Sequence, residues 1–415
     1  MPLFTKQEKS PASTVVEEVL KVKKNETALI VANPETTVIA QELFTALLEV
    51  GAKPSLIFQT KKSSMDGAEK SVIGAIKSEP NVVISISECK LGKDSEAVAS
   101  PYKAEDGTSY DHIFDFLLDG KKSIRAVWTP GLTQDMFNRT VQIDYKLLGE
   151  RCKKICALYQ NAVSVHVTSP NGTDVHVPVN GRNPLVDDGD FSLSGSGGNI
   201  PCGEVFISPV VGNGNTLVSD ALKKVSSVKD AISGALKVKG QQESSVLSDD
   251  TASDASPCGT QGTIVFDGSM TFSDGDALLK TPITVTVNAG FVSDIAGGEE
   301  AKRLLKDIIA AEKESLALEA TGKLPSGQGA VYARNARNIG ELGIGLNPSA
   351  NVNGNMLEDE KAFRTCHFAI GANYDGDAPS LIHFDGIVRN PTLVIEYANG
   401  SSYTLLKDGD LLLEA

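Results

Sequence analysis

The stretch TALIVANPETTVIAQELFTALLEVGAKPSLIFQT, residues 27–60, joins two β-branched apolar runs through a segment with apolar side chains at helical spacing. Its ends, 27–33 and 54–60, have the composition of buried strands, and residues 37–51 have that of an amphipathic helix. A strand, a helix and a second strand in this order predict a parallel sheet covered by helices.

The same pattern continues to about residue 160, through a helical segment near 67–78, the runs NVVISIS at 81–87 and AVWTPG at 126–131, and a long helix over about 134–161. We therefore predict an N-terminal, open and mostly parallel α/β domain over residues 1–160. The turn after its first strand reads NPETT and lacks the GxGxxG loop that approaches a pyrophosphate, which disfavours dinucleotide binding.

Beyond residue 160 short period-2 runs separated by turns predict a β-rich α+β domain over residues 161–415. VSVHVTSPNGTDVHVPV (163–179) is typical of a hairpin around Asn171 and Gly172, and ITVTVNAGFVSDI (283–295) of a second one. Further strand candidates are GEVFISPVV (203–211) and GTIVFDGSM (262–270). One clear helix, 298–320, places leucines and isoleucines along one face.

Residues 213–261 interrupt this β-rich pattern. An amphipathic stretch is followed there by a polar tail, QQESSVLSDDTASDASPCGTQ. We expect an inserted helical hairpin or lid with a loose tail. A surface insertion without a role is an equally good interpretation.

Composition excludes several classes of function. With 53 acidic against 39 basic residues the net charge is -14, so we expect no nucleic acid partner, because phosphate backbones attract basic surfaces. No apolar run approaches the roughly 20 residues that span a bilayer, so we expect no membrane association. The start, MPLFTKQEKSPAS, has neither a basic nor an apolar region of a secretory signal, which favours a cytoplasmic protein.

Chemistry concentrates near the C-terminus. Only five histidines occur, and two of them, His367 and His383, lie in a stretch rich in glycine, asparagine and acids. Within LIHFDGIV, His383 and Asp385 are two apart in a strand candidate, so both side chains leave the same face and can reach one ion. We expect the other histidines (His112, His166 and His176) to be ordinary polar residues, and Cys152 and Cys156 to be reduced thiols without a metal.

Two glutamates stand where a strand candidate meets a glycine-rich turn, Glu204 in GGNIPCGEVF and Glu341 in ARNIGELGIG. An unpaired carboxylate in a buried strand costs several kcal/mol, so each needs a partner. One possibility is a salt bridge to a nearby arginine, with Arg334, Arg337 and Arg389 as candidates. The other is a divalent cation: three carboxylates and two imidazoles suit two zinc, cobalt or manganese ions that share a carboxylate.

These motifs resemble those of the aminopeptidase T family of metallopeptidases, in order through the second half of the chain. NIPCGEVF (199–206), NIGELGIGLN (338–347), DEK (359–361) with HFAIG (367–371), and HFD (383–385) are similar to the family's blocks. The resemblance implies five metal ligands, Glu204, Glu341, His367, His383 and Asp385. It also makes Glu341 the bridge between the ions and Tyr374 an assistant in catalysis.

The resemblance implies a dinuclear metal-dependent aminopeptidase that removes N-terminal residues from peptides with a metal-activated water, and a homodimer. The first half resembles the family only loosely, as an α/β domain of similar length, and residues 213–261 depart from it.

Two alternatives remain open at this point. A relative of the same fold is a mononuclear iron dioxygenase acting on a hydroxylated pyridine, whose two-histidine, one-carboxylate triad would need only His367, His383 and Asp385. A non-catalytic binding relative is the other, with the insertion as its interaction surface. Glu204 and Glu341 have no explanation in the dioxygenase, and the complete ligand set disfavours the binding protein.

Overall fold

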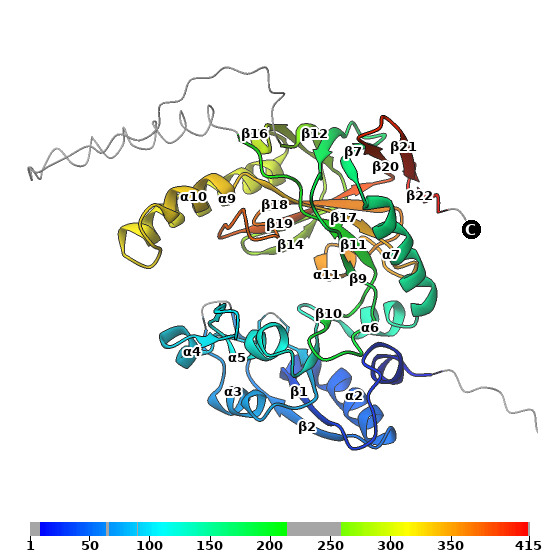
Figure 1. Cartoon of the computed structure of the whole chain (residues 1–415), viewed down its shortest axis with the longest axis vertical. Coiled ribbons are helices and arrows are strands. Elements are labelled where there is room, and N and C mark those ends of the chain that lie inside the picture. Colours follow the sequence, from blue (N-terminus) through cyan, green and yellow to red (C-terminus); the bar gives the residue numbers. More distant parts are fainter. Residues whose placement is uncertain (1–8, 64–65, 89, 214–258, 414–415) are drawn as a thin grey trace, which may run out of the picture.

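The computed structural model describes residues 9–63, 66–88, 90–213 and 259–413. Three larger sheets organise these residues, one in the N-terminal part and two in the C-terminal part (Figure 1). The predicted α/β fold class is confirmed, with a parallel sheet first and antiparallel sheets after it. Most of the insertion lies outside the described residues, and so does the expectation of a helical hairpin or lid there.

The N-terminal sheet is parallel throughout, in the order β10-β6-β3-β1-β2. Its strands are β1 (Thr27–Ala32), β2 (Lys53–Phe58), β3 (Val82–Ile86), β6 (Arg125–Trp128) and β10 (Gly197–Asn199). The central strand β3 is buried along its whole length, as its mostly apolar run VVISI predicts for a strand covered on both faces. A small hairpin, β4 (Tyr102–Lys103) with β5 (Ser109–Tyr110), lies apart from it.

Helices of the N-terminal part include α2 (Thr37–Glu49), which buries Ile39, Leu43 and Leu47 against the sheet. The other helical segments are α1 (Pro11–Thr14), η1 (Val15–Val19), η2 (Pro34–Thr36), α3 (Lys70–Lys77), α4 (Ser95–Ala99), α5 (Ile113–Asp115) and η3 (Phe116–Gly120). The helix expected over 134–161 is two helices, α6 (Gln134–Thr140) and α7 (Tyr145–Tyr159). The break is local, because the Asp144 side chain accepts a hydrogen bond from the Leu147 backbone N–H and starts a new helix.

The seven-stranded sheet has the order β14-β13-β19-β18-β17-β11-β9. Its strands are β9 (Leu185–Asp187), β11 (Glu204–Ile207), β13 (Ser269–Phe272), β14 (Gly275–Leu278), β17 (Ile339–Gly345), β18 (Thr365–Gly371) and β19 (His383–Arg389). The expected strand over 203–211 is therefore shorter, ending at Ile207.

The eight-stranded sheet has the order β16-β15-β12-β8-β7-β20-β21-β22. Its strands are β7 (Ala162–Thr168), β8 (Asp174–Pro178), β12 (Gln261–Phe266), β15 (Ile283–Asn288), β16 (Phe291–Gly297), β20 (Thr392–Tyr397), β21 (Ser402–Lys407) and β22 (Asp410–Leu411). The run expected as one strand over 262–270 is split between the two sheets, β12 in this one and β13 in the other. The break falls at Asp267 and Gly268, whose N–H groups both donate to the Ile387 carbonyl.

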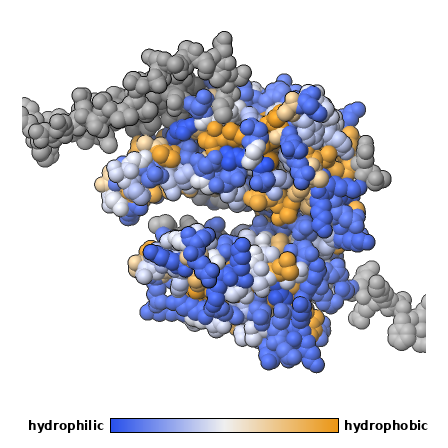
Figure 2. All heavy atoms as spheres, in the orientation of Figure 1, coloured by the Kyte–Doolittle hydropathy of each residue, from blue (hydrophilic) through white to orange (hydrophobic). Residues whose placement is uncertain are grey.

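Among the described residues, three helices accompany the C-terminal sheets: α9 (Glu299–Ala320), α10 (Gln328–Asn335) and α11 (Met356–Asp359). Helix α9 runs along β16 and buries Leu304 and Ile308, as its apolar face predicts. On the face drawn in Figure 2, a groove separates the part built on the parallel sheet from the part built on the other two. Strand β10 belongs to the parallel sheet although it follows residue 160, so the chain returns once across the boundary that we expected; the domain division itself stays a prediction.

Candidate metal centre

Four neighbouring strands of the seven-stranded sheet carry the five candidate ligands. Strands β19, β18, β17 and β11 are adjacent in that order. They hold, respectively, His383 with Asp385, His367, Glu341 and Glu204. Of these side chains only that of His383 is noticeably accessible, at 25%. The pairing of four strands thus gathers residues that are up to 181 positions apart (385 minus 204) in the sequence.

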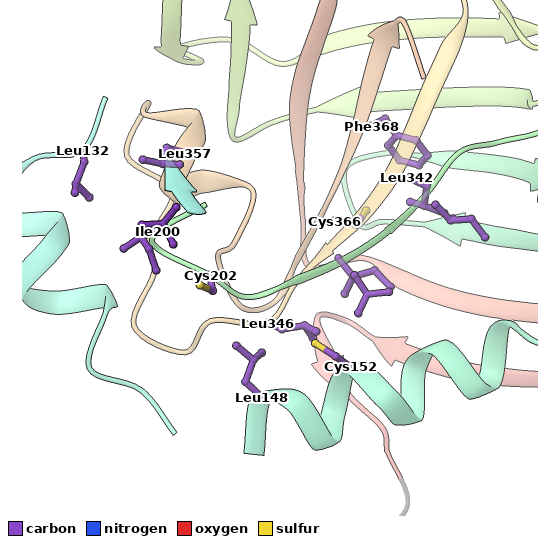
Figure 3. Packing of buried hydrophobic residues seen from close by; sticks show 14 of the residues in the cluster. Leu132, Leu148, Cys152, Ile200, Cys202, Leu342, Leu346, Leu357, Cys366 and Phe368 are labelled. Carbon is purple, nitrogen blue, oxygen red and sulfur yellow. The ribbon is translucent and has the colours of Figure 1, made fainter. Parts of the chain in front are cut away.

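Strand register puts these side chains on one face. Ala369 of β18 pairs with Glu341 on one side and Asp385 on the other, so a small residue separates two acidic ones. Alternation turns the neighbouring residues to the opposite face. There Leu342 and Phe368 belong to the apolar cluster that Leu148 and Cys152 of α7 also join (Figure 3). Packing of the apolar face holds the strands in place, and the opposite face carries the candidate ligands.

Gly343 makes the space that the His367 ring occupies. The two residues are paired between β17 and β18, and a Cβ atom at Gly343 would lie 2.0 Å from His367 Nε2. No side chain larger than hydrogen fits there without moving the imidazole. Gly343, the second glycine of the GELGIG motif, is therefore required for the His367 ring to fit.

Glu341 lies in the middle of the cluster. Its Oε1 is 2.9 Å from His367 Nε2, and its Oε2 is 3.3 Å from His383 Nε2. Beyond these contacts, His367 Nε2 is 3.6 Å from Glu204 Oε2, and His383 Nε2 is 3.4 Å from Asp385 Oδ1. Two groups of possible ligands result: Glu204, Glu360 and His367 in one, and Glu341, His383 and Asp385 in the other.

His383 is oriented by the backbone, because its Nδ1–H donates to the Ala372 carbonyl at 2.9 Å. This contact leaves Nε2 as the nitrogen that faces the carboxylates, the arrangement usual for metal-bound histidine. The Tyr374 ring packs edge-on against His383, with centroids 5.3 Å apart, and against Phe206 on its other side. Tyr374 is 60% exposed, so this corner of the cluster is open to solvent.

A buried lysine that we did not predict completes the cluster. Lys361 is fully buried, and its Nζ lies 2.5 Å from Glu204 Oε1 and 2.5 Å from Glu360 Oε1, with Asp187 Oδ2 at 3.9 Å. The ammonium group holds one oxygen of each glutamate. The other oxygen of Glu204, Oε2, lies toward His367 and has no hydrogen-bond donor within the described part of the chain.

The titratable groups of the cluster shift one another's pKa values. Burial lowers the pKa of His367, but the contact with Glu341 outweighs it and raises the pKa to about 9. Burial raises the pKa of Glu341, yet His367 and His383 bring it down to about 2. Burial raises the pKa of Glu360 to about 8 even though Lys361 opposes that shift. Nearby positive charge therefore stabilises the ionised form of these buried carboxylates. A divalent cation supplies more of that charge than an imidazolium does.

None of the three arginines considered as partners pairs with Glu204 or Glu341 among the described contacts. Arg337 pairs with Glu312, and Arg389 donates to the Asp267 carbonyl. Arg334 donates to the Gly212 carbonyl and lies over the Phe291 ring. The arginine interpretation is wrong; Lys361 is the cation beside Glu204.

Glu360 and Lys361 were not predicted to lie in the site. They belong to the run EDEK, residues 358–361, and a run of charges usually marks a solvated surface. Here Glu358, Asp359 and Lys361 are completely buried. The DEK motif, residues 359–361, is the signal in the sequence that points to these two residues.

A separate cavity of about 560 Å³ lies beside the parallel sheet, next to Ser85 and Ser87 at the end of β3 and Trp128 at the end of β6. Open α/β sheets bind ligands at this edge. No candidate metal ligand lines this cavity among the described residues, so we do not count it as part of the metal centre.

The fold defines a structural class with members of different activity. The chain is similar to the 2,5-dihydroxypyridine dioxygenase of Pseudomonas putida KT2440, with a TM-score of 0.60, 15% identity and 97% of each chain covered. It is equally similar to the wild-type AmpT of Thermus thermophilus, with a TM-score of 0.59, 14% identity, and 97% of this chain and 98% of that one covered. At such identities the likeness is one of fold alone. No family model matches the chain, and no curated protein matches it in sequence.

Proposed function

We propose that this chain is a dinuclear metal-dependent aminopeptidase. One observation carries the proposal: Glu341 presents one oxygen to His367 and the other to His383, so it stands between two groups of ligands. A carboxylate in that position suits a bridge between two ions. The similarity in fold to AmpT supports the same reaction class.

The residues fit a divalent metal by two tests. Buried Glu204 Oε2 and Asp385 Oδ1 have no hydrogen-bond partner among the residues that the structure describes, and such orphaned acceptors are costly unless a cation satisfies them. The donors are carboxylates and imidazoles, which suit zinc, cobalt or manganese. One ion would be held by Glu204, His367 and Glu360. The other would be held by His383 and Asp385, and Glu341 would be a ligand of both.

Bound ions of this kind polarise a peptide carbonyl and lower the pKa of a coordinated water toward neutrality. The protein's own groups supply the rest. Lys361 Nζ fixes Glu204 Oε1 and thereby aims Oε2 at the centre. The Tyr374 ring lies against His383 at the solvent-open corner, and its hydroxyl would donate a hydrogen bond to the oxygen on which negative charge develops.

The iron dioxygenase is the second candidate, because a solved neighbour with that activity covers the chain as fully. Its triad would be His367, His383 and Asp385. The ligand groups divide this triad, with His367 in one and His383 and Asp385 in the other. Glu204 and Glu360 also remain without a role in a mononuclear iron site, so we favour the peptidase.

A metal and substrate analysis separates the candidates. Protein purified without added metal is analysed by mass spectrometry and assayed with leucyl nitroanilide and, for oxygen uptake, with 2,5-dihydroxypyridine. We expect two equivalents of zinc, cobalt or manganese in the centre and nitroanilide hydrolysis that phenanthroline abolishes. Bound iron with pyridine-dependent oxygen uptake would replace the proposal by the dioxygenase, and neither metal nor turnover would favour a non-catalytic relative.

We further propose a cytoplasmic homodimer with domains at residues 1–160 and 161–415. The dimer follows from the resemblance to the aminopeptidase T family. Sedimentation velocity at micromolar concentration tests it: a species of twice 43.8 kDa is expected, and a 43.8 kDa species alone would contradict it. The described residues contain no helix long and apolar enough to cross a membrane.

A further inference from the structure

Two histidines lie side by side on the outer face of the eight-stranded sheet, away from the seven-stranded sheet that carries the metal centre. His166 of β7 pairs directly with His176 of β8. Their rings are stacked, with centroids 4.0 Å apart and an interplanar angle of 7°. Alternation places both on the accessible face, because their neighbours Val165 and Val175 are fully buried.

Two carboxylates flank the pair. Asp174 Oδ1 lies 2.8 Å from His166 Nε2, and Glu396 Oε2 of β20 lies 3.9 Å from His176 Nδ1. Ser164 donates a hydrogen bond to the same oxygen of Glu396 and so fixes its position. Three adjacent strands, β8, β7 and β20, thus contribute to one cluster.

We propose that His166, His176 and Asp174, with Glu396 at the side, form a second site for a divalent transition metal of the zinc, nickel or copper type. One ligand atom from each of the first three residues lies within 4.8 Å of the others. Two neutral imidazoles with carboxylate oxygens are the donor set that these ions prefer. Two carboxylates also balance the charge of a divalent ion, so binding leaves no excess charge on the sheet.

The exposure of the cluster determines what kind of site it is. Side chains of His166, His176 and Asp174 are 30%, 54% and 72% accessible. An ion here keeps water in its shell and exchanges with solvent. It ties β7 to β8 and reaches β20, so it stabilises the sheet that supports the C-terminal part without contacting the candidate catalytic residues.

These histidines had no predicted role, because period-2 alternation predicts an exposed face but not the residue that lies opposite. His166 and His176 are ten positions apart, and only the register of the hairpin makes them direct neighbours. A slip of one residue would turn one ring into the core.

Zinc binding to the full chain tests the proposal. Protein stripped with a chelator and dialysed is titrated with zinc and analysed for bound metal, in parallel with the double variant His166→Asn/His176→Asn. We expect the double variant to lose one equivalent of zinc and to keep the tighter equivalents of the metal centre. Thr168→Ala, on the same face of β7, is the matched control and should bind as the parent does.

A second, spectroscopic experiment tests the surface site whether or not the proposed function is correct. In the Glu341→Gln background one equivalent of Cu²⁺ should give an electron paramagnetic resonance signal with splitting from two nitrogens. Asp174→Asn should weaken binding at least about tenfold, because it removes a proposed ligand and even loss of an outer-shell partner costs about that much. Unchanged zinc stoichiometry in a folded double variant would overturn the proposal. So would a copper signal that is the same with and without the two histidines.

Discussion

At the scale of single residues, Glu341 is the group on which both halves of the metal centre depend. Replacing Glu341 with Gln keeps its volume and removes the charge shared by His367 and His383. We expect nitroanilide hydrolysis to fall at least about a hundredfold while the protein stays folded. Steady-state rates and circular dichroism measure this, with the exposed Glu299→Gln as the control; a variant that retains full activity would refute the bridging role.

The buried Lys361 should contribute strongly to the stability of the fold. It is the buried cation between Glu204, Glu360 and Asp187, so Lys361→Met leaves carboxylates buried without their partner. We expect a loss of about 3–5 kcal/mol in the free energy of unfolding, the usual result of breaking a buried ion pair. Urea denaturation of metal-free protein measures it.

A control distinguishes this effect from loss of any lysine. Lys121 pairs with Glu79 on the surface, where both side chains are more than a third exposed. Lys121→Met should change stability by less than about 1 kcal/mol. Equal effects of the two substitutions would show that Lys361 is not a positioning cation.

At the scale of elements, the close approach of β17 and β18 determines whether His367 can stay in place. Gly343→Ala puts a Cβ atom 2.0 Å from His367 Nε2, so the imidazole must move. We expect bound metal and activity to be lost together, with a lowered melting temperature. Gly74→Ala in α3, where nothing lies within 4 Å of the new atom, is the matched control and should leave metal binding intact.

The start of β6 in the parallel sheet supplies a prediction about pH. Burial raises the pKa of Glu26, but the two-pronged hydrogen bond from buried Arg125 outweighs it and lowers the pKa below its ordinary value of 4.5. The folded state therefore binds fewer protons than the unfolded state. The pair's contribution is complete above about pH 4.5 and is lost as the pH falls through the lowered pKa.

Glu26→Gln leaves the Arg125 guanidinium buried at 4% exposure without its anion. We expect the variant to lose about 3 kcal/mol in the free energy of unfolding near neutral pH. The difference from the parent should shrink at acidic pH, where the parent's carboxylate is protonated as well. Denaturation curves at several pH values measure this, and a constant difference across pH would contradict the ion-pair explanation.

At the scale of the whole molecule, metal binding should stabilise the fold, because the ligands come from four strands that only the folded chain brings together. Zinc at a thousand times its dissociation constant should add about 4 kcal/mol to the free energy of unfolding. Calorimetry with and without chelator measures it, in the His166→Asn/His176→Asn background so that the surface site does not contribute. Absence of the shift in this double-variant background would contradict a built metal centre.

The fold class follows from patterns that can be read along the amino-acid sequence. Period-2 and helical spacing are local properties, so the parallel α/β start, the β-rich remainder and helix α9 could be predicted from residue order. The same alternation predicted that His383 and Asp385 share a face. The motifs also named the five candidate ligands that the structure brings together, although their role as ligands stays a prediction.

The residues that meet across strands are set by the packing of the folded chain and could not be read from the sequence. The EDEK run is typical of a solvated surface, yet Arg139 binds Glu358 and backbone N–H groups of Asn353 and Gly354 bind Asp359, so the run is buried. Glu360 and Lys361 join the metal centre for the same reason, and strand register alone makes His166 and His176 neighbours. Local patterns report the period of a segment; the partners that satisfy a buried charge are set by the packing of segments far apart in sequence.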